Sequence, residues 1–311
     1  MSGSSKKAIY AALIGNSMIA VTKFAAAIHT GSSAMMSEGI HSLVDTGNQV
    51  LLLYGIKRSN KPASPGFPFG HGKEIYFWSF VVAMLIFALG GTVSIYKGWQ
   101  HLFHPTSISN ILINYAVLGF AIVFEGAALW VAFKEFNLSR GSRSIIRAIT
   151  RGKDPTLFVV VFEDTAALLG LLVALGGLVA YQITGNPVFD ALASIGIGVV
   201  LIFTALILAL ESKSLLIGES ADPEVVSAID ELLAKHDSVS AVNEVATLHM
   251  GPEFIVVTVS IDVNDALAGG QIERTVTHLT RQIKATDPRI QRVFIEMERS
   301  EDHYEPTERI D

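Results

Sequence analysis

The stretch "IHSLVDTGN", residues 40–48, lies within an otherwise apolar segment and carries two titratable side chains, His41 and Asp45. On insertion scales a charged residue costs roughly 2.5 to 3.5 kcal/mol at the centre of a bilayer, so such residues need a compensating role. The whole chain is apolar: half of its 311 residues are hydrophobic, 17% are charged, and the mean hydropathy is +0.45. This composition predicts a polytopic membrane protein.

Apolar runs along the chain are long enough, at about 20 residues each, to cross a hydrocarbon core about 30 Å thick. They cover residues 8–28, 33–56, 76–96, 110–133, 156–181 and 188–210. Of the Lys and Arg residues that flank these runs, 12 lie on one side of the predicted membrane and only Lys97 lies on the other. By the positive-inside rule both termini are expected in the cytoplasm. We therefore predict an α-helical membrane protein with six transmembrane helices, which form a transport domain over residues 1–211.

The first apolar run lacks a small-residue cleavage site and is followed closely by another span, so no cleavable signal is predicted. The chain has no cysteine, which excludes disulfides and thiolate metal ligands. A short N-terminus without an Arg-rich helix favours a bacterial inner (plasma) membrane.

Residues 212–311 contain no further span and hold 19 acidic and 9 basic residues, a net charge of −10. Such a tail disfavours nucleic acid as a partner. Its periodicities predict helix, strand, strand, helix and strand over 222–235, 239–250, 253–263, 269–285 and 290–298. We expect a cytoplasmic α+β domain of order αββαβ in two layers.

His41 and Asp45 are four residues apart, so a helix places them on one face, and Asn48 falls on the same stripe. The fifth span contributes Glu163 and Asp164, roughly 12 to 14 Å into its helix at 1.5 Å per residue. One imidazole with two or three carboxylates suits Zn²⁺ in tetrahedral coordination. Mn²⁺ or Fe²⁺ also fits such an oxygen-rich set.

A structural alternative is that these polar groups pair with one another, or with Lys23 in the first span, only to hold the helices together. Four costly residues on two spans seldom serve packing alone, and we therefore favour a metal site. A scaffold that senses metal without transporting it and a cation channel are further alternatives; a channel needs a continuous polar pore. No pairing of a nucleophile with a base is apparent, so an enzyme is not expected.

The sequence resembles the cation diffusion facilitator family over nearly its whole length. The resemblance rests on the six spans with an acidic αββαβ tail, on "TGSSAMMSEGIHSLVDTGNQVLLLYGI" (30–56), on "FGHGK" (69–73) and on "DALASIGIGVVL" (190–201). It implies a homodimer with ferredoxin-like cytoplasmic tails for dimerisation and regulation. It also implies export of Zn²⁺ or a related divalent ion in exchange for H⁺, with Mn²⁺, Fe²⁺, Co²⁺ and Cd²⁺ as other cargoes. An exporter that prefers Mn²⁺ or Fe²⁺ is the alternative within the family.

By position, the resemblance implies that His41, Asp45 and Asp164 bind the transported ion. The family's zinc members usually have a histidine four residues before the carboxylate of the fifth span, where this chain has Val160. Glu163 is the nearest substitute and completes the predicted transport site with those three residues. Loss of one imidazole nitrogen weakens the case for strict selectivity of Zn²⁺ over Mn²⁺.

Asn48 and His71 are weaker candidates for metal binding. His71 matches one ligand of a second, loop site in the family, but the companion positions hold Phe67 and Ser64, so we expect that site to be absent or weak. In the tail, we expect strand-edge residues to be solvated rather than bound to metal: Glu244, His249, Glu296 and Glu298.

Other charged residues have open roles. Lys73 matches a lysine that holds the dimer near the membrane in some members, and Glu219 is its candidate partner. Glu38 and Glu125 are expected either to pair with Lys23 or to relay protons.

Metal binding requires a neutral His41 and ionised carboxylates, so protons and metal compete for the same side chains. Exporting a divalent ion against an inside-negative potential costs roughly 4.6 kcal/mol per 100 mV, and each entering proton returns about half of that. The sequence favours no particular proton stoichiometry.

Overall fold

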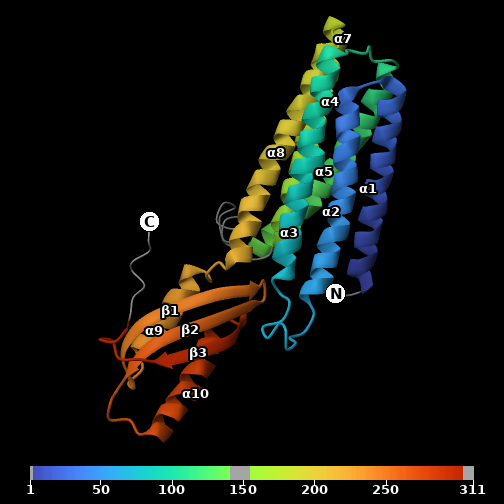
Figure 1. The fold of residues 1–311 in the computed structure, drawn as a ribbon. Coiled ribbons are helices and arrows are strands. Elements are labelled where there is room, and N and C mark those ends of the chain that lie inside the picture. Colours follow the sequence, from blue (N-terminus) through green and yellow to red (C-terminus); the bar gives the residue numbers. More distant parts are fainter. Residues whose placement is uncertain (1–2, 141–154, 304–311) are drawn as a thin grey trace. The chain divides into compact units, whose positions relative to one another are not determined.

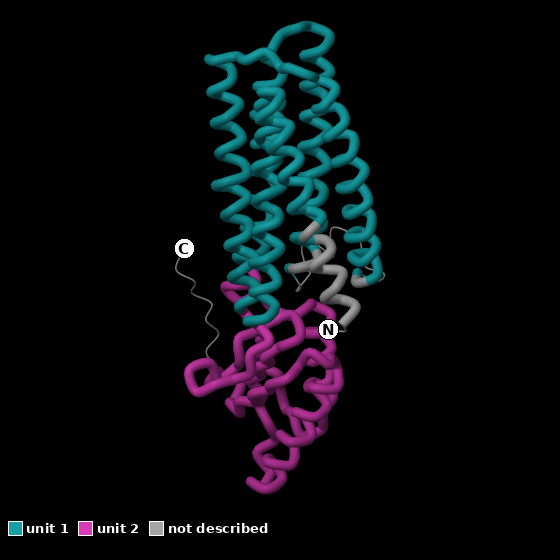
Figure 2. The backbone as a smooth tube through the Cα atoms, turned by 90° about the vertical axis from the view of Figure 1, so that its right-hand side faces the viewer, with its two compact units in different colours: residues 1–58, 74–213 teal, residues 59–73, 214–311 magenta. Residues whose placement is uncertain are grey.

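A computed structural model describes residues 3–140 and 155–303. The chain divides into two compact units, coloured separately in Figure 2. One comprises residues 1–58 and 74–213, and the other comprises residues 59–73 and 214–311. The division into domains 1–211 and 212–311 stays a prediction; the compact units differ from it in adding the loop 59–73 to the second unit.

The first unit is built from long helices (Figure 1) that coincide with the predicted apolar runs. The helices are α1 (Gly3–Thr30), α2 (Ser33–Ser59), α5 (Ile111–Arg140), α7 (Pro155–Thr184) and α8 (Val188–Ile217). The remaining run is one continuous helix that changes pitch, from α3 (Glu74–Leu85) through the π-helix η1 (Ile86–Gly91) to α4 (Thr92–Phe103).

By length and composition, four described helical segments are able to cross a membrane. They are Glu74–Phe103, Ile111–Leu138, Phe158–Thr184 and Val188–Ile217. The segment α2 is not among them, since its polar residues, including Glu38, Asp45 and Asn48, lower its hydropathy. The helical membrane-type unit is therefore observed, while a count of six spans stays a prediction.

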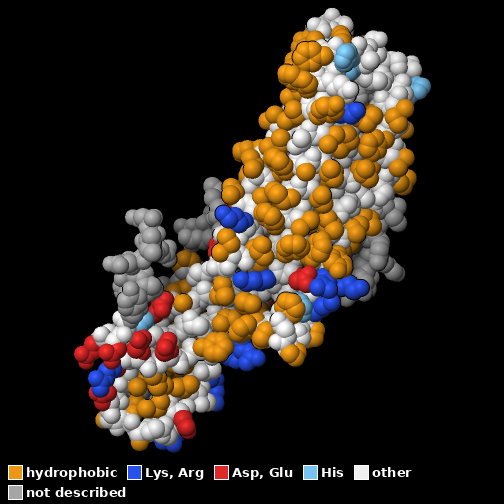
Figure 3. All heavy atoms as spheres, viewed as in Figure 1, with side chains coloured by type: hydrophobic (Ala, Val, Ile, Leu, Met, Phe, Trp, Pro, Cys, Tyr) orange, Lys and Arg blue, Asp and Glu red, His pale blue; other side chains and the backbone are white. Residues whose placement is uncertain are grey.

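Hydrophobic side chains cover much of the outer surface of the helical unit, as Figure 3 shows for one face. Ile28, Leu112, Phe120, Trp130 and Phe203 are among the large apolar side chains that point outward. An apolar surface this extensive is typical of a face in contact with lipid or with another protein chain.

Within the unit, α5 lies along α7 and also contacts α1, and α3 contacts α7. The helix α4 approaches α8 closely at Gly98, where an added Cβ would lie 2.7 Å from the carbonyl oxygen of Ala191. Small residues of this kind allow two membrane helices to pack backbone against backbone.

The second unit contains α9 (Pro223–Ala234), β1 (Val239–Gly251), β2 (Phe254–Val263), α10 (Gly269–Thr286) and β3 (Ile290–Met297), in the predicted order αββαβ. The sheet order is β1-β2-β3, with β1 antiparallel to β2 and β2 parallel to β3. The parallel pair requires a crossover connection, which α10 provides.

The core of the second unit lies between its sheet and its helices. Ile229 of α9 and Leu279 of α10 are fully buried and belong to one cluster with Val257 and Ile261 of the central strand β2. The helices α9 and α10 therefore bury the apolar faces that their sequence periodicity predicts.

Asp222 occupies the N-cap position of α9, but its side chain makes no capping hydrogen bond. Instead it accepts a hydrogen bond of 3.5 Å from Nη2 of Arg289. Arg289 also donates to Asp287 through Nη2 at 2.7 Å and through Nε at 3.0 Å. The side-chain hydrogen bonds from Arg289 lower the pKa of the Asp287 carboxyl group.

Because the pKa of Asp287 is lower in the folded tail than in the unfolded chain, the ion pair with Arg289 stabilises the tail above the unfolded pKa. This contribution is lost as the pH falls through the folded pKa. We predict that hydrogen exchange at residues 283–293 of the full chain, corrected for the intrinsic rate, accelerates below about pH 4 and that Asp287→Asn removes this acid-dependent component. Glu231→Gln is the matched control, since its ion pair with Lys235 is exposed. An acid response that Asp287→Asn leaves unchanged would contradict the assignment.

Candidate metal transport site

A buried polar stripe runs along α2. The side chains of Glu38, His41 and Asn48 are at most 1% exposed. Nδ1 of His41 lies 3.3 Å from Oδ1 of Asp45, whose side chain is 13% exposed. The helix thus places His41 and Asp45 on one face, as their spacing predicts.

The helix α7 meets this stripe through Glu163. Nδ2 of Asn48 donates a hydrogen bond of 2.8 Å to Oε1 of Glu163, and both side chains are buried. The carboxyl group of Asp45 interacts electrostatically with those of Glu163 and Asp164. The structure therefore brings the predicted residues of α2 and α7 into one region, with Asn48 as the link between the two helices.

Glu125 of α5 belongs to the same group of carboxylates, although the sequence assigned it no role in the site. It is 6% exposed and interacts electrostatically with Asp45 and Asp164. A single glutamate in an apolar span carries no spacing signal, so only the packing of α5 along α7 reveals its place.

Several nitrogen and oxygen atoms of the stripe have no hydrogen-bond partner. They are Nδ1 and Nε2 of His41, Oδ1 of Asp45 and Oδ1 of Asn48, all of them buried. Buried polar atoms without partners are costly, so each atom of this kind needs an explanation. Among the described residues, however, no three His, Asp or Glu side chains are already arranged as a metal site. The unpartnered oxygens and an imidazole nitrogen offer lone pairs of the kind that coordinate a divalent cation.

The fully buried Lys23 of α1 pairs with a residue outside the four-residue predicted site. Its Nζ donates to Oε2 of Glu38 at 3.0 Å and to Oγ of Ser42 at 2.8 Å. Of the two glutamates expected to pair with Lys23 or to relay protons, Glu38 makes the ion pair. Lys23 forms its hydrogen bonds with Glu38 and Ser42. The structural alternative in which Lys23 pairs with the site residues is therefore not observed.

Val160 lies on α7 one turn before Asp164. Its isopropyl group supplies no ligand where the family's zinc members usually have an imidazole. The predicted site therefore has one nitrogen-bearing side chain, His41, among carboxylates, which suits oxygen-preferring ions as well as Zn²⁺.

His71, the weaker candidate of the loop, and the strand residues of the tail lie in the second unit. The ring of His71 packs beside that of Phe67, with their centroids 4.3 Å apart. Glu244 and Glu296 are exposed, as expected for solvated strand-edge residues. Glu298 lies 2.8 Å from Nδ1 of His303.

The predictions for His249 and Lys73 have different outcomes. His249 is fully buried, with Nδ1 at 3.2 Å from the carbonyl oxygen of Gly251, so the prediction of a solvated histidine is wrong. The alternation of the strand alone did not reveal which face is covered. Lys73 donates to the carbonyl oxygen of Leu216 at 3.4 Å, and its pairing with Glu219 stays a prediction.

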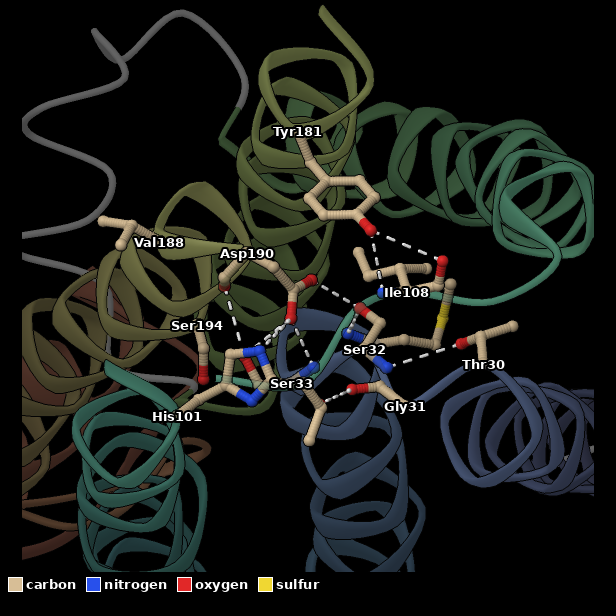
Figure 4. A network of polar contacts seen from close by, with 12 residues as sticks. Thr30, Gly31, Ser32, Ser33, His101, Ile108, Tyr181, Val188, Asp190 and Ser194 are labelled. Carbon is tan, nitrogen blue, oxygen red and sulfur yellow. Dashed lines mark hydrogen bonds and ion pairs between the residues drawn. The ribbon is translucent and has the colours of Figure 1, made fainter. Parts of the chain in front are cut away.

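A second polar cluster, centred on Asp190 of α8, was not predicted (Figure 4). Its carboxylate accepts hydrogen bonds from Oγ of Ser32 at 2.5 Å, from the backbone N–H of Ser33 at 2.5 Å and from Oγ of Ser33 at 2.8 Å. Nε2 of His101 on α4 lies 3.7 Å from the same carboxylate. The only sequence signal for this cluster was Asp190, the first residue of "DALASIGIGVVL". A single acidic residue in the first turn of a helix is usually interpreted as a capping residue.

The Asp190 cluster joins three helices at the end where α2 begins. Its carboxylate caps the N-terminus of α2 from another helix, where the helix dipole favours a negative charge. One turn further along α2, Oγ of Ser37 lies 2.6 Å from Oγ of Ser194, which donates to the carbonyl oxygen of Ser94 at 2.9 Å. These two polar layers hold α2, α4 and α8 together.

Comparison with known proteins identifies the class. Residues 9–217 match the cation efflux transmembrane domain. The chain is 37% identical over 247 residues to the human proton-coupled zinc antiporter SLC30A9, mitochondrial, a match that covers 79% of this chain and 44% of that protein. It is 32% identical over 262 residues to metal tolerance protein C4 of Arabidopsis thaliana, covering 84% and 57%. It is 24% identical over 262 residues to the cation-efflux pump FieF of Escherichia coli, covering 84% and 82%.

These matches place the chain in a class of integral membrane, multi-pass transport proteins. The chain belongs to the cation efflux, or cation diffusion facilitator, family, which its sequence resembles. It spans about half the length of its human and Arabidopsis relatives. The family is a class of transporters rather than of enzymes, and the absence of catalytic activity in this chain stays a prediction.

Proposed function

We propose that the protein is a proton-coupled antiporter that exports Zn²⁺ or a related divalent metal ion from the cytoplasm. The observation that carries the proposal is the His41–Asp45 pair on α2, joined to Glu163 of α7 through Asn48 in a buried part of the bundle. The names of two relatives, a proton-coupled zinc antiporter and a cation-efflux pump, support the same conclusion.

In this proposal His41, Asp45, Glu163 and Asp164 hold the ion. Asn48 orients Glu163, and its unpartnered Oδ1 is a further oxygen within the stripe. The imidazole must be neutral and the carboxylates ionised to bind metal, so protonation of the same groups releases it. One set of side chains can therefore carry protons in one direction and metal in the other.

The membrane topology, the assembly and the location are parts of the proposal. The six long helical segments are proposed to span the membrane with both termini in the cytoplasm, by the distribution of Lys and Arg. The αββαβ tail is proposed to be ferredoxin-like and to dimerise. A bacterial inner membrane is the proposed location, although one relative is named mitochondrial.

The donor set favours a second candidate within the same function, an exporter that prefers Mn²⁺ or Fe²⁺. Val160 replaces an imidazole that would favour Zn²⁺, and the neighbouring donors are oxygens. Co²⁺ and Cd²⁺ are the remaining cargoes to compare.

Uptake into proteoliposomes tests the proposal. Purified protein should move Zn²⁺ or one of the four other divalent ions faster when a pH gradient drives protons in the direction opposite to the metal than when no gradient is imposed. Each ion is measured separately against protein-free liposomes. A scaffold that only senses metal gives no uptake above that background, and a channel gives uptake that a pH gradient does not change; either result would contradict the proposal.

A further inference from the structure

The ion pair of Lys23 and Glu38 lies beside the proposed transport site and is used by none of the steps above. Both side chains are fully buried. Lys23 also donates to Ser42, the residue that follows His41 in α2. A lysine in a membrane helix is rare and usually has a functional reason.

The ammonium group of Lys23 acts on the site residues through space. It interacts electrostatically with His41, Asp45 and Glu125. In a water-poor interior such interactions are much stronger than in solvent. A divalent ion bound by His41 and Asp45 would therefore be repelled by Lys23.

Glu38 offsets this positive charge and reaches a third helix. Oε2 of Glu38 bonds to Lys23, whereas Oε1 has no hydrogen-bond partner. A Cβ added at Gly170 of α7 would lie 2.5 Å from this Oε1, so the glycine makes room for the carboxylate. The pair thus touches α1, α2 and α7, two of which carry the proposed ligands.

We propose that Lys23 is a positioning residue of the transport cycle: its buried charge lowers the affinity of the site for a divalent cation enough to permit release. Glu38 partly neutralises this charge and so sets how strongly the ion is repelled. This inference rests on the proposed function. In this proposal Lys23 binds no metal itself.

The inference predicts opposite effects for the two partners. Lys23→Met removes the repulsion, so the metal binds more tightly and leaves more slowly. Glu38→Gln leaves the lysine uncompensated, so the metal binds more weakly. If the pair is only a brace between helices, both substitutions weaken the same contact and shift transport in the same direction.

The experiment measures KM and maximal rate for Zn²⁺ uptake in proteoliposomes. We expect KM to fall at least about threefold and the maximal rate to drop for Lys23→Met, and KM to rise at least about threefold for Glu38→Gln. Lys23→Arg keeps the charge and should have a KM close to the native value. The double variant, with Lys23→Met and Glu38→Gln, removes both charges and should also have a KM close to the native value. Lys97→Met, which removes a lysine of α4 outside this group, is the matched control.

Shifts of KM in the same direction for both single variants would overturn the inference. If Lys23→Met does not fold, Glu38→Gln is compared with the double variant that carries both substitutions. The inference then requires the double variant to have a lower KM than Glu38→Gln, because the two proteins differ only in the lysine charge. Failure of the proposed function gives a different result: the native protein transports no metal, or Asp45→Asn transports as well as the native protein. Metal transport that depends on Asp45 but shows no opposite shifts rejects only the role of Lys23.

Discussion

Asp45→Asn is expected to lower metal uptake in proteoliposomes by roughly 100-fold or more, since loss of a group that merely supports a metal ligand already costs about 10- to 100-fold. The substitution keeps the size of the side chain but removes the negative charge beside His41. An amide also cannot alternate between a proton-bound and a metal-bound form as a carboxylate can.

The matched control for Asp45→Asn is Glu135→Gln, which neutralises an exposed carboxylate of α5. It should leave uptake close to the native rate. Uptake by correctly folded Asp45→Asn protein at the native rate would remove Asp45 from the site.

Asp190→Ala is expected to destabilise the helical unit by about 3 kcal/mol or more, because each buried polar group left without a partner costs about 1 to 3 kcal/mol. The hydroxyl group of Ser32 and the backbone N–H of Ser33 lose their acceptor, and the hydroxyl group of Ser33 keeps only the backbone carbonyl oxygen of Asp190, at 3.2 Å. For a unit of about 150 to 250 residues such a loss lowers the midpoint of thermal unfolding by about 6 to 12 °C.

Thermal unfolding of detergent-purified protein measures this effect. Asp190→Asn keeps one acceptor oxygen and should fall between the native protein and Asp190→Ala. An Asp190→Ala protein that unfolds at the native temperature would show that the Asp190 cluster does not hold the beginning of α2.

Features that are encoded locally were predictable from the sequence. The run 188–210 is apolar over the length of a membrane span, and it forms part of α8. In the tail, the period of 3.6 over residues 222–235 and the β-branched run "FIVVTVSIDV" identify α9 and β2 to within a residue or two. The spacing of His41 and Asp45 likewise fixes their common face.

Features that depend on contacts between distant segments were not predictable. Asp190 meets Ser32 and Ser33 across more than 150 residues of sequence, and no local pattern links them. The choice of Glu38 rather than Glu125 as the partner of Lys23 depends on how α1 packs against α2. His249 was assigned to the surface because strand alternation gives two faces without saying which one is covered.

A crystal structure of the Zn²⁺-loaded protein, with anomalous diffraction recorded at the zinc absorption edge, tests most directly whether α2 and α7 converge on one ion. We expect an anomalous peak between these helices, about 2.0 to 2.2 Å from a nitrogen of His41 and from carboxylate oxygens. The peak should be absent from Asp45→Asn protein. Zinc bound only elsewhere in protein that transports zinc, with His41 and Asp45 free of metal, would contradict this account.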